Sequence, residues 1–550
     1  MNKKINNPVI SGFYPDPTIC RVGEDYYMAC SSFELYPGIP VFHSKDLVHW
    51  EQLCNAMNME NGFHVEKNSM VGGVMAPTLR YYNGVFYIIN ANFSHKGNYI
   101  VTAKDPAGPW SPPHWLDDVP GIDASLFFDD DGKVYILGTG NVWDNGAGSM
   151  EHGIWLAEYD IQNFKMIGKP VTIFNSALRV GASPEAPHIF HVGDYYHLII
   201  AEGGTEHYHA VMSARSRDIM GFYEGNPANP VMTHRNMGFK CPITNVGHAD
   251  LVELPDGSWY AVMLASRLIA GECKNLGRET FICPVVWERD WPLFSPETGK
   301  LEWEYDAPKC LPWTEYPEKQ NYYDFRKETL DDHWVCWGTP YEKFYEIKDS
   351  KLALECRRQR LDDTLRQMSM SGETSEEYFV SMLAQRQCEP DTIVTAQMSF
   401  MPREGENAGL AVIQAMNYQM HLRRVCKEGK QLLQLVAAST EYDRPPYFPG
   451  FTSTGSLEVL AECEWKAAEI ILQIEIEKER FTIRYGKTKD MLDVLVLADG
   501  KRINPEKVGC MAGTIIGMYA TGNGADSDNK AFFEWFEMKN QKKMPRGNEL

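Results

Sequence analysis

The sequence has 550 residues, in which 53 Lys and Arg stand against 74 Asp and Glu, giving a net charge of -21 at pH 7. Binding to a nucleic-acid backbone is driven by basic surface, so this balance excludes nucleic acid as an expected partner. A chain of this length is too long for one compact core, and we expect two or more domains.

The start of the chain and its cysteines both bear on location. Residues 1–17 carry two lysines but no apolar run as long as the core of a signal peptide. No later window of about 18 apolar residues predicts a membrane span. The 13 cysteines are scattered from Cys20 to Cys510 without a CxxC pair, which is typical of a reducing compartment. We therefore expect a cytoplasmic protein without a membrane partner.

Five similar segments follow one another between residues 7 and 305. Each contains a short apolar run, a turn with Gly, Asn or Asp, and a second run led by an aromatic residue, the pattern of a β-hairpin. They open at Asp16, Met75, Asp123, Glu185 and His248 and reach their aromatic at Tyr27, Tyr87, Tyr135, Tyr196 and Tyr260. Successive openings are 59, 48, 62 and 63 residues apart, a period that fits one four-stranded propeller blade with its loops. The repeat predicts a five-bladed β-propeller.

The residues that open these segments indicate chemistry. If each segment is the innermost hairpin of its blade, its opening residue lies at one end of the central channel. Asp16, Asp123, Glu185 and His248 would then converge from distant parts of the chain. Each alone is also typical of a turn or a strand end, but gathering like charges costs desolvation energy and raises their pKa values without helping the fold. Their shared position predicts a functional site.

The loop after the second strand of each segment should border the same end of the channel, because the strands of a hairpin are antiparallel. Phe33, Thr205 and Arg278 lie on three of these loops. An aromatic ring can stack on the apolar face of a sugar, and hydroxyl and guanidinium groups can hydrogen-bond to its hydroxyls. We predict these three residues as substrate contacts, although packing within the loops would explain each of them equally well.

A second domain is predicted after a linker. Residues 306–321 are rich in Pro and charge, as expected for a linker, and the second domain covers 322–550. Its clearest strands are 470–476 and 481–485, in which apolar and polar residues alternate. Further strand-like runs at 392–401, 408–414, 432–436 and 515–520 favour an antiparallel β-sandwich. This domain repeats no acids, so the chemistry is assigned to the first domain, residues 1–305.

Several longer segments make the chain resemble glycoside hydrolase family 43, in particular its β-xylosidases and α-L-arabinofuranosidases with a C-terminal concanavalin-like sandwich. These segments are NPVISGFYPDPTI (7–19), SSFELYPGIPVFHSKDLVHW (31–50), GIDASLFFDDDGKVY (121–135), SPEAPHIF (183–190), AEGGTEHYHAV (201–211), VGHADLVE (246–253) and GRETFICPVVWERDWP (277–292). The resemblance covers almost the full length. It implies an all-β chain in which a five-bladed propeller is followed by a concanavalin-like jelly roll.

The resemblance also implies a role for each matching residue. Asp16 looks like the general base that activates water, Glu185 like the general acid that protonates the leaving oxygen, and Asp123 like the acid that orients Glu185 and raises its pKa. An inverting hydrolase needs two carboxyls roughly 6.5 to 9.5 Å apart, with one kept protonated near neutral pH, and this division of roles agrees with that need. His248 and Arg278 match positions at the base of the sugar site.

Two further features concern the centre of the site. Met75 and Ala76 match a family segment that reads Trp-Ala, so a stacking surface for the terminal sugar is replaced by Met75 in this chain. Some relatives hold a calcium ion near the channel centre beside the histidine that His248 matches, and calcium there is compatible with this sequence. We expect no tight protein-ligated metal site, and the hydrolysis requires no cofactor.

The implied function is exo-acting, inverting hydrolysis that releases terminal xylose or arabinofuranose from xylo-oligosaccharides or arabinoxylan fragments. Two other classes stay open. A non-catalytic propeller that binds carbohydrate would share the aromatic rim without needing three acids. A fructan or sucrose hydrolase would retain configuration, although its acid typically precedes Cys, whereas Glu185 precedes Ala186. A homo-oligomer is compatible with the sequence.

Overall fold

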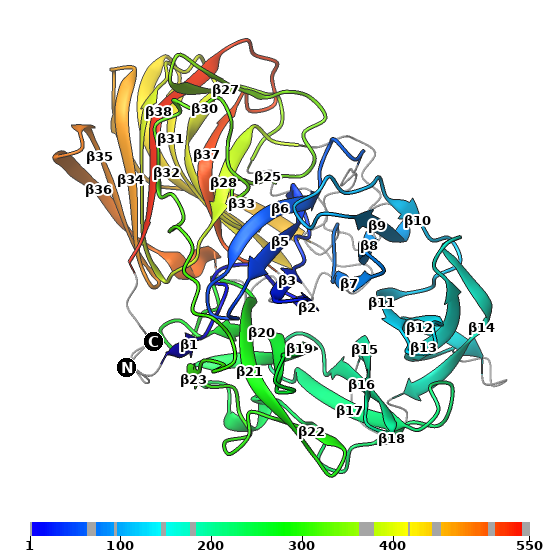
Figure 1. Cartoon of the computed structure of the whole chain (residues 1–550). Helices are drawn as coiled ribbons and strands as arrows, with labels where there is room; N and C mark the ends of the chain where they lie inside the picture. The colour runs from blue at the N-terminus through cyan, green and yellow to red at the C-terminus, as the bar shows by residue number, and fades with distance from the viewer. Residues whose placement is uncertain are drawn as a thin grey trace.

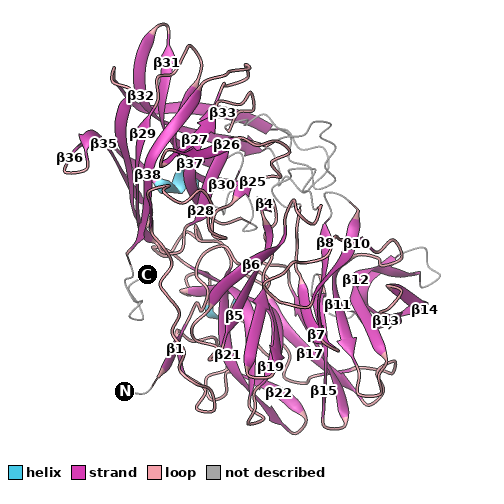
Figure 2. Ribbon diagram, turned by 45° about the horizontal axis from the view of Figure 1, so that its top comes forward, coloured by secondary structure: helices cyan, strands magenta, loops and turns pink. Residues whose placement is uncertain are grey.

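The computed structural model describes residues 3–62, 73–92, 96–144, 150–175, 183–361, 379–415, 418–442, 453–503 and 512–541. These residues are almost entirely strands, turns and loops (Figure 2). The helices among them are the short 3-10 segments η1 (Arg235–Met237) and η2 (Gly500–Ile503), and neither is long and apolar enough to cross a membrane. The prediction of an all-β protein is confirmed.

The first part of the chain forms five four-stranded sheets, each built from strands that are close in sequence. The first two sheets contain β2 (Thr18–Val22), β3 (Asp25–Ala29), β5 (Gly38–Ser44) and β6 (Glu51–Met57), then β7 (Thr78–Tyr82), β8 (Val85–Asn92), β9 (Gly97–Ala103) and β10 (His114–Trp115). The third contains β11 (Ile122–Phe128), β12 (Val134–Asp144), β13 (Met150–Asp160) and β14 (Lys165–Asn175). The last two contain β15 (Glu185–Val192), β16 (Tyr195–Glu202), β17 (Ala210–Ser216) and β18 (Glu224–Gly225), then β19 (Ile243–Glu253), β20 (Trp259–Arg267), β21 (Glu279–Glu288) and β22 (Trp291–Phe294).

The first strands of the five sheets surround a common centre (Figure 1). Around it, β2 contacts β7 and β19, β11 contacts β7 and β15, and β15 contacts β19, so these strands form a closed ring. The first and second strands of every sheet pair as antiparallel hairpins, which confirms the five predicted hairpins. Outside the sheets, β1 (Lys4–Asn6) pairs with β23 (Glu304–Asp306) and joins the beginning of this part of the chain to its end.

The hairpin turns form where the sequence offers residues that tolerate positive φ. Asn83 and Gly84 connect β7 to β8 with φ angles of 49° and 81°, as a two-residue turn between twisted strands requires. Gly23 and Gly193 adopt φ angles of 63° and 61° in the turns that follow β2 and β15. Local turn chemistry therefore determines where each hairpin reverses.

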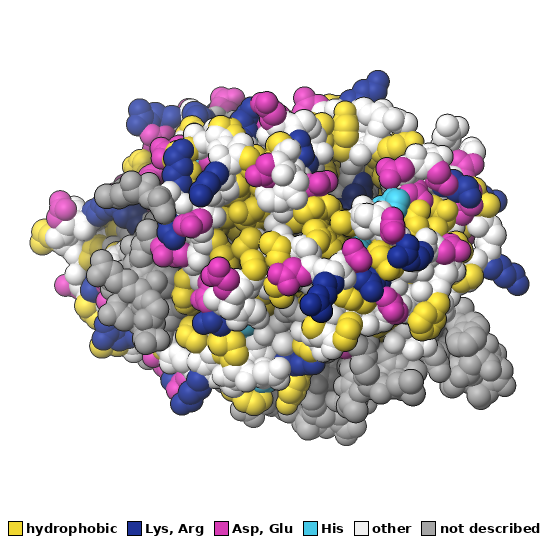
Figure 3. All heavy atoms as spheres, turned by 60° about the horizontal axis from the view of Figure 1, so that its bottom comes forward, with side chains coloured by type: hydrophobic (Ala, Val, Ile, Leu, Met, Phe, Trp, Pro, Cys, Tyr) yellow, Lys and Arg dark blue, Asp and Glu magenta, His cyan; other side chains and the backbone are white. Residues whose placement is uncertain are grey.

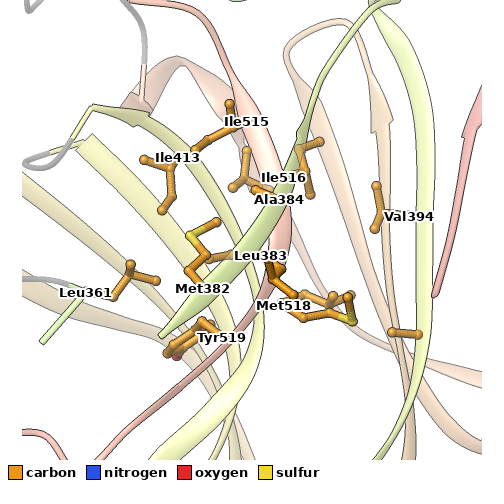
Figure 4. Packing of buried hydrophobic residues seen from close by; sticks show 14 of the residues in the cluster. Leu361, Met382, Leu383, Ala384, Val394, Ile413, Ile515, Ile516, Met518 and Tyr519 are labelled. Atoms are coloured by element: carbon orange, nitrogen blue, oxygen red, sulfur yellow. The ribbon is translucent and has the colours of Figure 1, made fainter. Parts of the chain in front are cut away.

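The C-terminal part of the chain forms two larger antiparallel sheets. The eight-stranded sheet contains β24 (Tyr322–Tyr323), β26 (Tyr345–Lys348), β27 (Lys351–Glu355), β29 (Asp391–Ser399), β34 (Glu469–Glu477), β35 (Arg480–Thr488), β36 (Met491–Asp499) and β38 (Lys530–Asn540). The six-stranded sheet contains β28 (Met382–Arg386), β30 (Asn407–Ala415), β31 (Tyr418–Lys427), β32 (Lys430–Tyr442), β33 (Ser453–Glu464) and β37 (Ile515–Thr521). Buried side chains of both sheets share one core, in which Val394 of the first sheet lies near Ile516 and Met518 of the second (Figure 4). The two sheets therefore pack as a sandwich.

The two parts of the chain meet beside the centre of the five sheets. There, β4 (Leu35–Tyr36) pairs with β25 (Cys336–Trp337). The backbone N–H of Thr514 donates a 2.9 Å hydrogen bond to the carbonyl of Asn275, on the loop that leads to Arg278. The C-terminal part therefore supports loops that surround the centre.

Candidate active site

The backbone is distorted where the predicted site residues lie. Asp16, Asp123 and His248 have φ angles of 55°, 51° and 54°, and Ala186, directly after Glu185, has 49°. Strand pairing also slips beside Asp123, Glu185 and His248. Bulges of this kind redirect side chains, and residues other than Gly at such φ angles store roughly 1–3 kcal/mol of strain each. A positive φ at or directly after the opening residue therefore recurs in four of the five repeated segments.

Asp16 is held as a carboxylate by cationic and hydrogen-bonding neighbours. It is buried, and Arg278 donates a hydrogen bond from Nη1 to its Oδ1 at 2.8 Å. His248 Nδ1 lies 3.7 Å from the same oxygen, and Ser31 Oγ donates to Oδ2 at 2.5 Å. Burial alone would raise the pKa of Asp16, but Arg278, His248 and Ser31 outweigh it and hold this pKa below its ordinary value. Asp16 is therefore ionised at neutral pH.

Asp123 and Glu185 experience the opposite environment. Burial, followed by the charges of Glu185 and Asp16, raises the pKa of Asp123 well above its ordinary value, although its Oδ2 accepts a 3.1 Å hydrogen bond from the Ala186 N–H. Burial, followed by the charge of Asp16, raises the pKa of the partly exposed Glu185 to about 7. Each of the two carboxyls therefore holds its proton to a higher pH than an ordinary carboxyl does, while Asp16 is ionised.

Arg278 joins two of the predicted substrate contacts to Asp16. Its Nη1 also lies 3.2 Å from Thr205 Oγ1, and its guanidinium carbon is 5.1 Å from the ring centroid of Phe33. Phe33 stacks in turn on Phe13, with ring centroids 5.7 Å apart. No described residue accepts a hydrogen bond from Arg278 Nε or Nη2, which are both buried. These N–H groups are chemically suited to oxygen atoms of a substrate.

Met75 and Ala76 lie at the edge of this group. Val74 forms a backbone bridge with Phe33, and the partly exposed Met75 packs against the hydrophobic cluster that contains Phe33. Ala76 is buried. Met75 therefore follows a residue whose backbone is paired with Phe33, and Ala76 is buried next to it.

A second polar layer, which the sequence did not reveal, lies further along the same strands. Arg80 donates from Nη1 and Nη2 to both oxygens of Asp250, at 2.8 and 3.1 Å, and Thr18 Oγ1 adds a 2.7 Å hydrogen bond. His188 Nδ1 lies 3.1 Å from Arg80 Nη2. Burial opposes ionisation of Asp250, but Arg80 and its other neighbours lower its pKa to about 2. This layer is an ion pair that ties four of the five central strands together.

Comparison with known proteins decides the family. Residues 5–292 match the family described as glycosyl hydrolases family 43, and residues 322–539 match the beta xylosidase C-terminal concanavalin A-like domain. The chain belongs to glycoside hydrolase family 43. It is 39% identical over 542 residues to a xylosidase/arabinosidase of Butyrivibrio fibrisolvens, which covers 97% of this chain and 99% of the relative.

A second relative of this family 43 chain and a solved structure are also named as glycosidases. The chain is 35% identical over 559 residues to a non-reducing end alpha-L-arabinofuranosidase of Bacteroides ovatus, covering 98% of this chain and 95% of the relative. The crystal structure of a xylan beta-1,4-xylosidase from Bacillus halodurans superimposes with a TM-score of 0.85 at 27% identity, covering 98% of this chain and all of the other. The prediction of an exo-acting glycoside hydrolase is confirmed.

The residues around His248 do not fit a calcium ion held by protein ligands. Calcium takes six to eight oxygen ligands, whereas the carboxylates that act on His248 are already engaged, Asp16 by Arg278 and Asp250 by Arg80. Arg278 also places positive charge near this position. One group of metal-type side chains occurs elsewhere among the described residues: Asp129, Asp130 and His191.

Proposed function

We propose that this family 43 enzyme is an inverting hydrolase that removes terminal xylose or arabinofuranose from xylo-oligosaccharides or arabinoxylan fragments. The observation that carries the proposal is the contrast in charge within one site, where Arg278 keeps Asp16 ionised while Asp123 and Glu185 retain a proton. Hydrolysis with inversion needs an ionised base and a protonated acid on opposite sides of the bond that is cleaved. The names of the two relatives support xylose and arabinofuranose as the sugars.

In the proposed reaction, Asp16 accepts a proton from a water molecule while the water oxygen attacks the anomeric carbon. Glu185 gives its proton to the glycosidic oxygen as the bond between that oxygen and the anomeric carbon breaks, so the leaving sugar departs as an alcohol. Attack opposite the leaving group inverts the anomeric configuration. Asp123 accepts a hydrogen bond from the Ala186 N–H and so fixes the segment that carries Glu185. Arg278 orients Asp16 and donates its remaining N–H groups to hydroxyls of the terminal sugar.

The architecture proposed for this reaction is a five-bladed propeller with the site at one end of its channel. The five sheets are the blades, and the ring of contacts among their first strands supports this assignment. Residues 1–305 form the propeller domain, 306–321 the linker, and 322–550 the concanavalin-like sandwich. The sandwich contributes support for the Arg278 loop and leaves the chemistry to the propeller.

The proposed partner is a neutral oligosaccharide, and neither nucleic acid nor a membrane is needed. On the face in Figure 3, acidic and basic side chains are interspersed around a central area of hydrophobic ones, which suits a neutral polymer better than a polyanion. We place the enzyme in the cytoplasm, a choice supported by the cysteines among the described residues, all of which are free. Acid–base hydrolysis of this type requires no cofactor. Static light scattering would determine whether copies of the chain associate.

NMR spectra recorded during hydrolysis test the proposal. The first sugar released should have the inverted anomeric configuration before mutarotation mixes the anomers, and retention would contradict the assigned roles. Parallel kinetics on aryl β-D-xylopyranoside and aryl α-L-arabinofuranoside identify the preferred pentose. Binding of either compound without cleavage would instead favour a non-catalytic, carbohydrate-binding protein.

A further inference from the structure

Three aromatic side chains from two loops form an exposed group, which we call the rim platform: His207, Tyr208 and Phe239. The rings of His207 and Phe239 stack with centroids 3.7 Å apart and an interplanar angle of 16°. The Tyr208 ring meets His207 edge-on at 5.1 Å. Phe239 is 70% exposed and Tyr208 61% exposed, so both present ring surface to solvent. Single exposed apolar residues are ordinary, but a group of stacked rings on a surface indicates binding.

The first loop of the rim platform is connected to the proposed catalytic residues. It follows β16, which ends one residue after Ala201, the strand partner of Glu185. Thr205 on this loop accepts a hydrogen bond from Arg278. His207 lies two residues further on, a separation that the chain spans in less than about 7 Å. The platform therefore begins at the border of the site.

The two loops are also anchored to each other and to the centre of the sheets. Thr233 Oγ1, on the loop that carries Phe239, donates a 2.7 Å hydrogen bond to the carbonyl of His209, which directly follows Tyr208. His209 is buried, and its Nδ1 lies 2.9 Å from the carbonyl oxygen of Asn245. A Cβ on Gly247 would come within 2.5 Å of the His209 ring, so the ring packs against backbone beside the site. Anchoring of this kind holds the exposed rings in position before any ligand binds.

We infer that the rim platform binds the leaving part of a pentose oligosaccharide, by stacking on the sugar units beyond the bond that is cleaved. This inference rests on the proposed function, in which the terminal sugar occupies the site and the rest of the chain projects outward. The C–H face of a sugar ring is apolar and matches an aromatic face. Three rings are too few for a stable protein interface, which covers about 800 Å² on each partner. Burial, followed by the charge of Lys274, lowers the pKa of His207, so its ring is neutral at pH 7 and suited to a neutral ligand.

The test compares Phe239→Ala and Tyr208→Ala with the parent enzyme on xylo-oligosaccharides of two to six units and on the preferred aryl glycoside. Loss of one stacking ring should lower kcat/KM for the longer chains about three- to tenfold, mainly through KM. The aryl glycoside has no extended leaving chain, so its kcat/KM should be unchanged. Phe222→Ala is a matched control, because Phe222 is 87% exposed but follows β17, which runs back to the opposite end of the sheet.

The outcomes separate the platform from the proposed function. If kcat/KM depends on the length of the xylo-oligosaccharide equally in the parent and in Phe239→Ala, the binding role of the rim platform is wrong, while the proposed hydrolase function stands. An equal loss on the aryl glycoside would also overturn it, because it would mean that the ring supports the site. If the parent cleaves no pentose glycoside, the proposed function fails. Titration of xylohexaose into the parent and into Phe239→Ala then tests whether the rim platform binds sugar. Weaker binding to Phe239→Ala supports that role, and equal binding to both proteins, or no binding to either, overturns it.

Discussion

The two polar layers at the centre of the five sheets are built in opposite ways. In the site layer, Asp123 and Glu185 lie beside ionised Asp16, and their pKa values rise because burial and like charge oppose ionisation. In the second layer, both oxygens of Asp250 accept hydrogen bonds from Arg80, and the pKa of Asp250 falls to about 2. The site layer gathers three carboxyls around Arg278, whereas the second layer pairs the carboxylate of Asp250 with Arg80.

The difference separates stability from catalysis within a few residues of the same strands. Asp250 lies two positions after His248, yet its contacts are those of a structural ion pair. The site layer also carries the backbone strain, since Asp16 and Asp123 adopt positive φ and Asp250 does not. Perturbed acids and strain together are expected where a protein gives up stability for chemistry. Matched substitutions in the two layers should therefore differ in their effect on turnover.

Replacing Asp16 by Asn should give the largest loss of activity. The amide cannot accept a proton from water, so turnover should fall about 10⁴-fold on every substrate, whatever its leaving group. The free energy of unfolding should also fall, because the buried Arg278 loses its carboxylate partner, as Arg80 does in Asp250→Asn. Steady-state kinetics and urea unfolding measure both quantities. Turnover within tenfold of the parent would remove Asp16 from the role of base.

Replacing Glu185 by Ala should cause a loss that depends on the leaving group. A xylobiose-like substrate needs protonation of its alkoxide and should lose about 10³-fold in kcat. An aryl glycoside with a good phenolate leaving group needs little protonation and should keep far more activity. Comparison of the two kcat ratios measures the effect. Equal losses on both substrates would show that Glu185 is not the acid.

Replacing Asp250 by Asn makes the same chemical change as Asp16→Asn, but in the paired layer. The guanidinium of Arg80 loses its carboxylate while remaining partly buried, so the free energy of unfolding should fall by about 3–5 kcal/mol. The kcat of the folded variant, measured well below its unfolding temperature, should stay within about tenfold of the parent, since Asp250 touches no reacting atom in the proposed mechanism. A variant of full stability with lost turnover would reverse the roles assigned to the two layers.

The hairpins and the site acids could be predicted because their signals are local and repeated. A turn such as Asn83-Gly84 sets its own φ angles, and the opening position of each repeat brings Asp16, Asp123 and Glu185 to one place. The paired layer could not be predicted in this way, because Arg80 and Asp250 are 170 residues apart and belong to no common motif. The positive φ of Asp16 also results from the surrounding fold and not from its own preference.

Strand β31 shows a different limit of sequence patterns. Its sequence, YQMHLRRVCK, alternates apolar and polar residues from Tyr418 to Arg423, which predicts a strand with one face in solvent, yet nine of its ten residues are buried. Arg424 there is fully buried because its Nη1 and Nη2 donate to the carbonyls of Ala467 and Trp465, at 2.6 and 2.9 Å. Partners that are 41 and 43 residues away make a polar residue compatible with the core, and no local pattern can supply them.

Replacing Asp123 by Asn should have the smallest effect on the pH dependence of kcat/KM. Burial and the charge of Asp16 raise the pKa of Glu185 to about 7, whereas Asp123 is itself protonated at that pH, because its own pKa lies well above the ordinary value. An amide at position 123 is as neutral as the protonated acid that it replaces, so the alkaline limb, which reports the proton on Glu185, should stay where it is in the parent. A limb that moved down by about one pH unit would show that Asp123 is ionised in the working enzyme and holds the proton on Glu185 by its charge.

A control in the same hairpin shows whether any shift is specific to position 123. Asp129 is also buried, but it accepts a 2.9 Å hydrogen bond from Tyr196 near the turn, away from Glu185. Asp129→Asn should leave the alkaline limb where it is in the parent, so a downward shift in Asp123→Asn alone would assign that effect to Asp123. With the limb unmoved in both variants, burial and Asp16 set the pKa of Glu185, and Asp123 acts through its hydrogen bond with the Ala186 N–H.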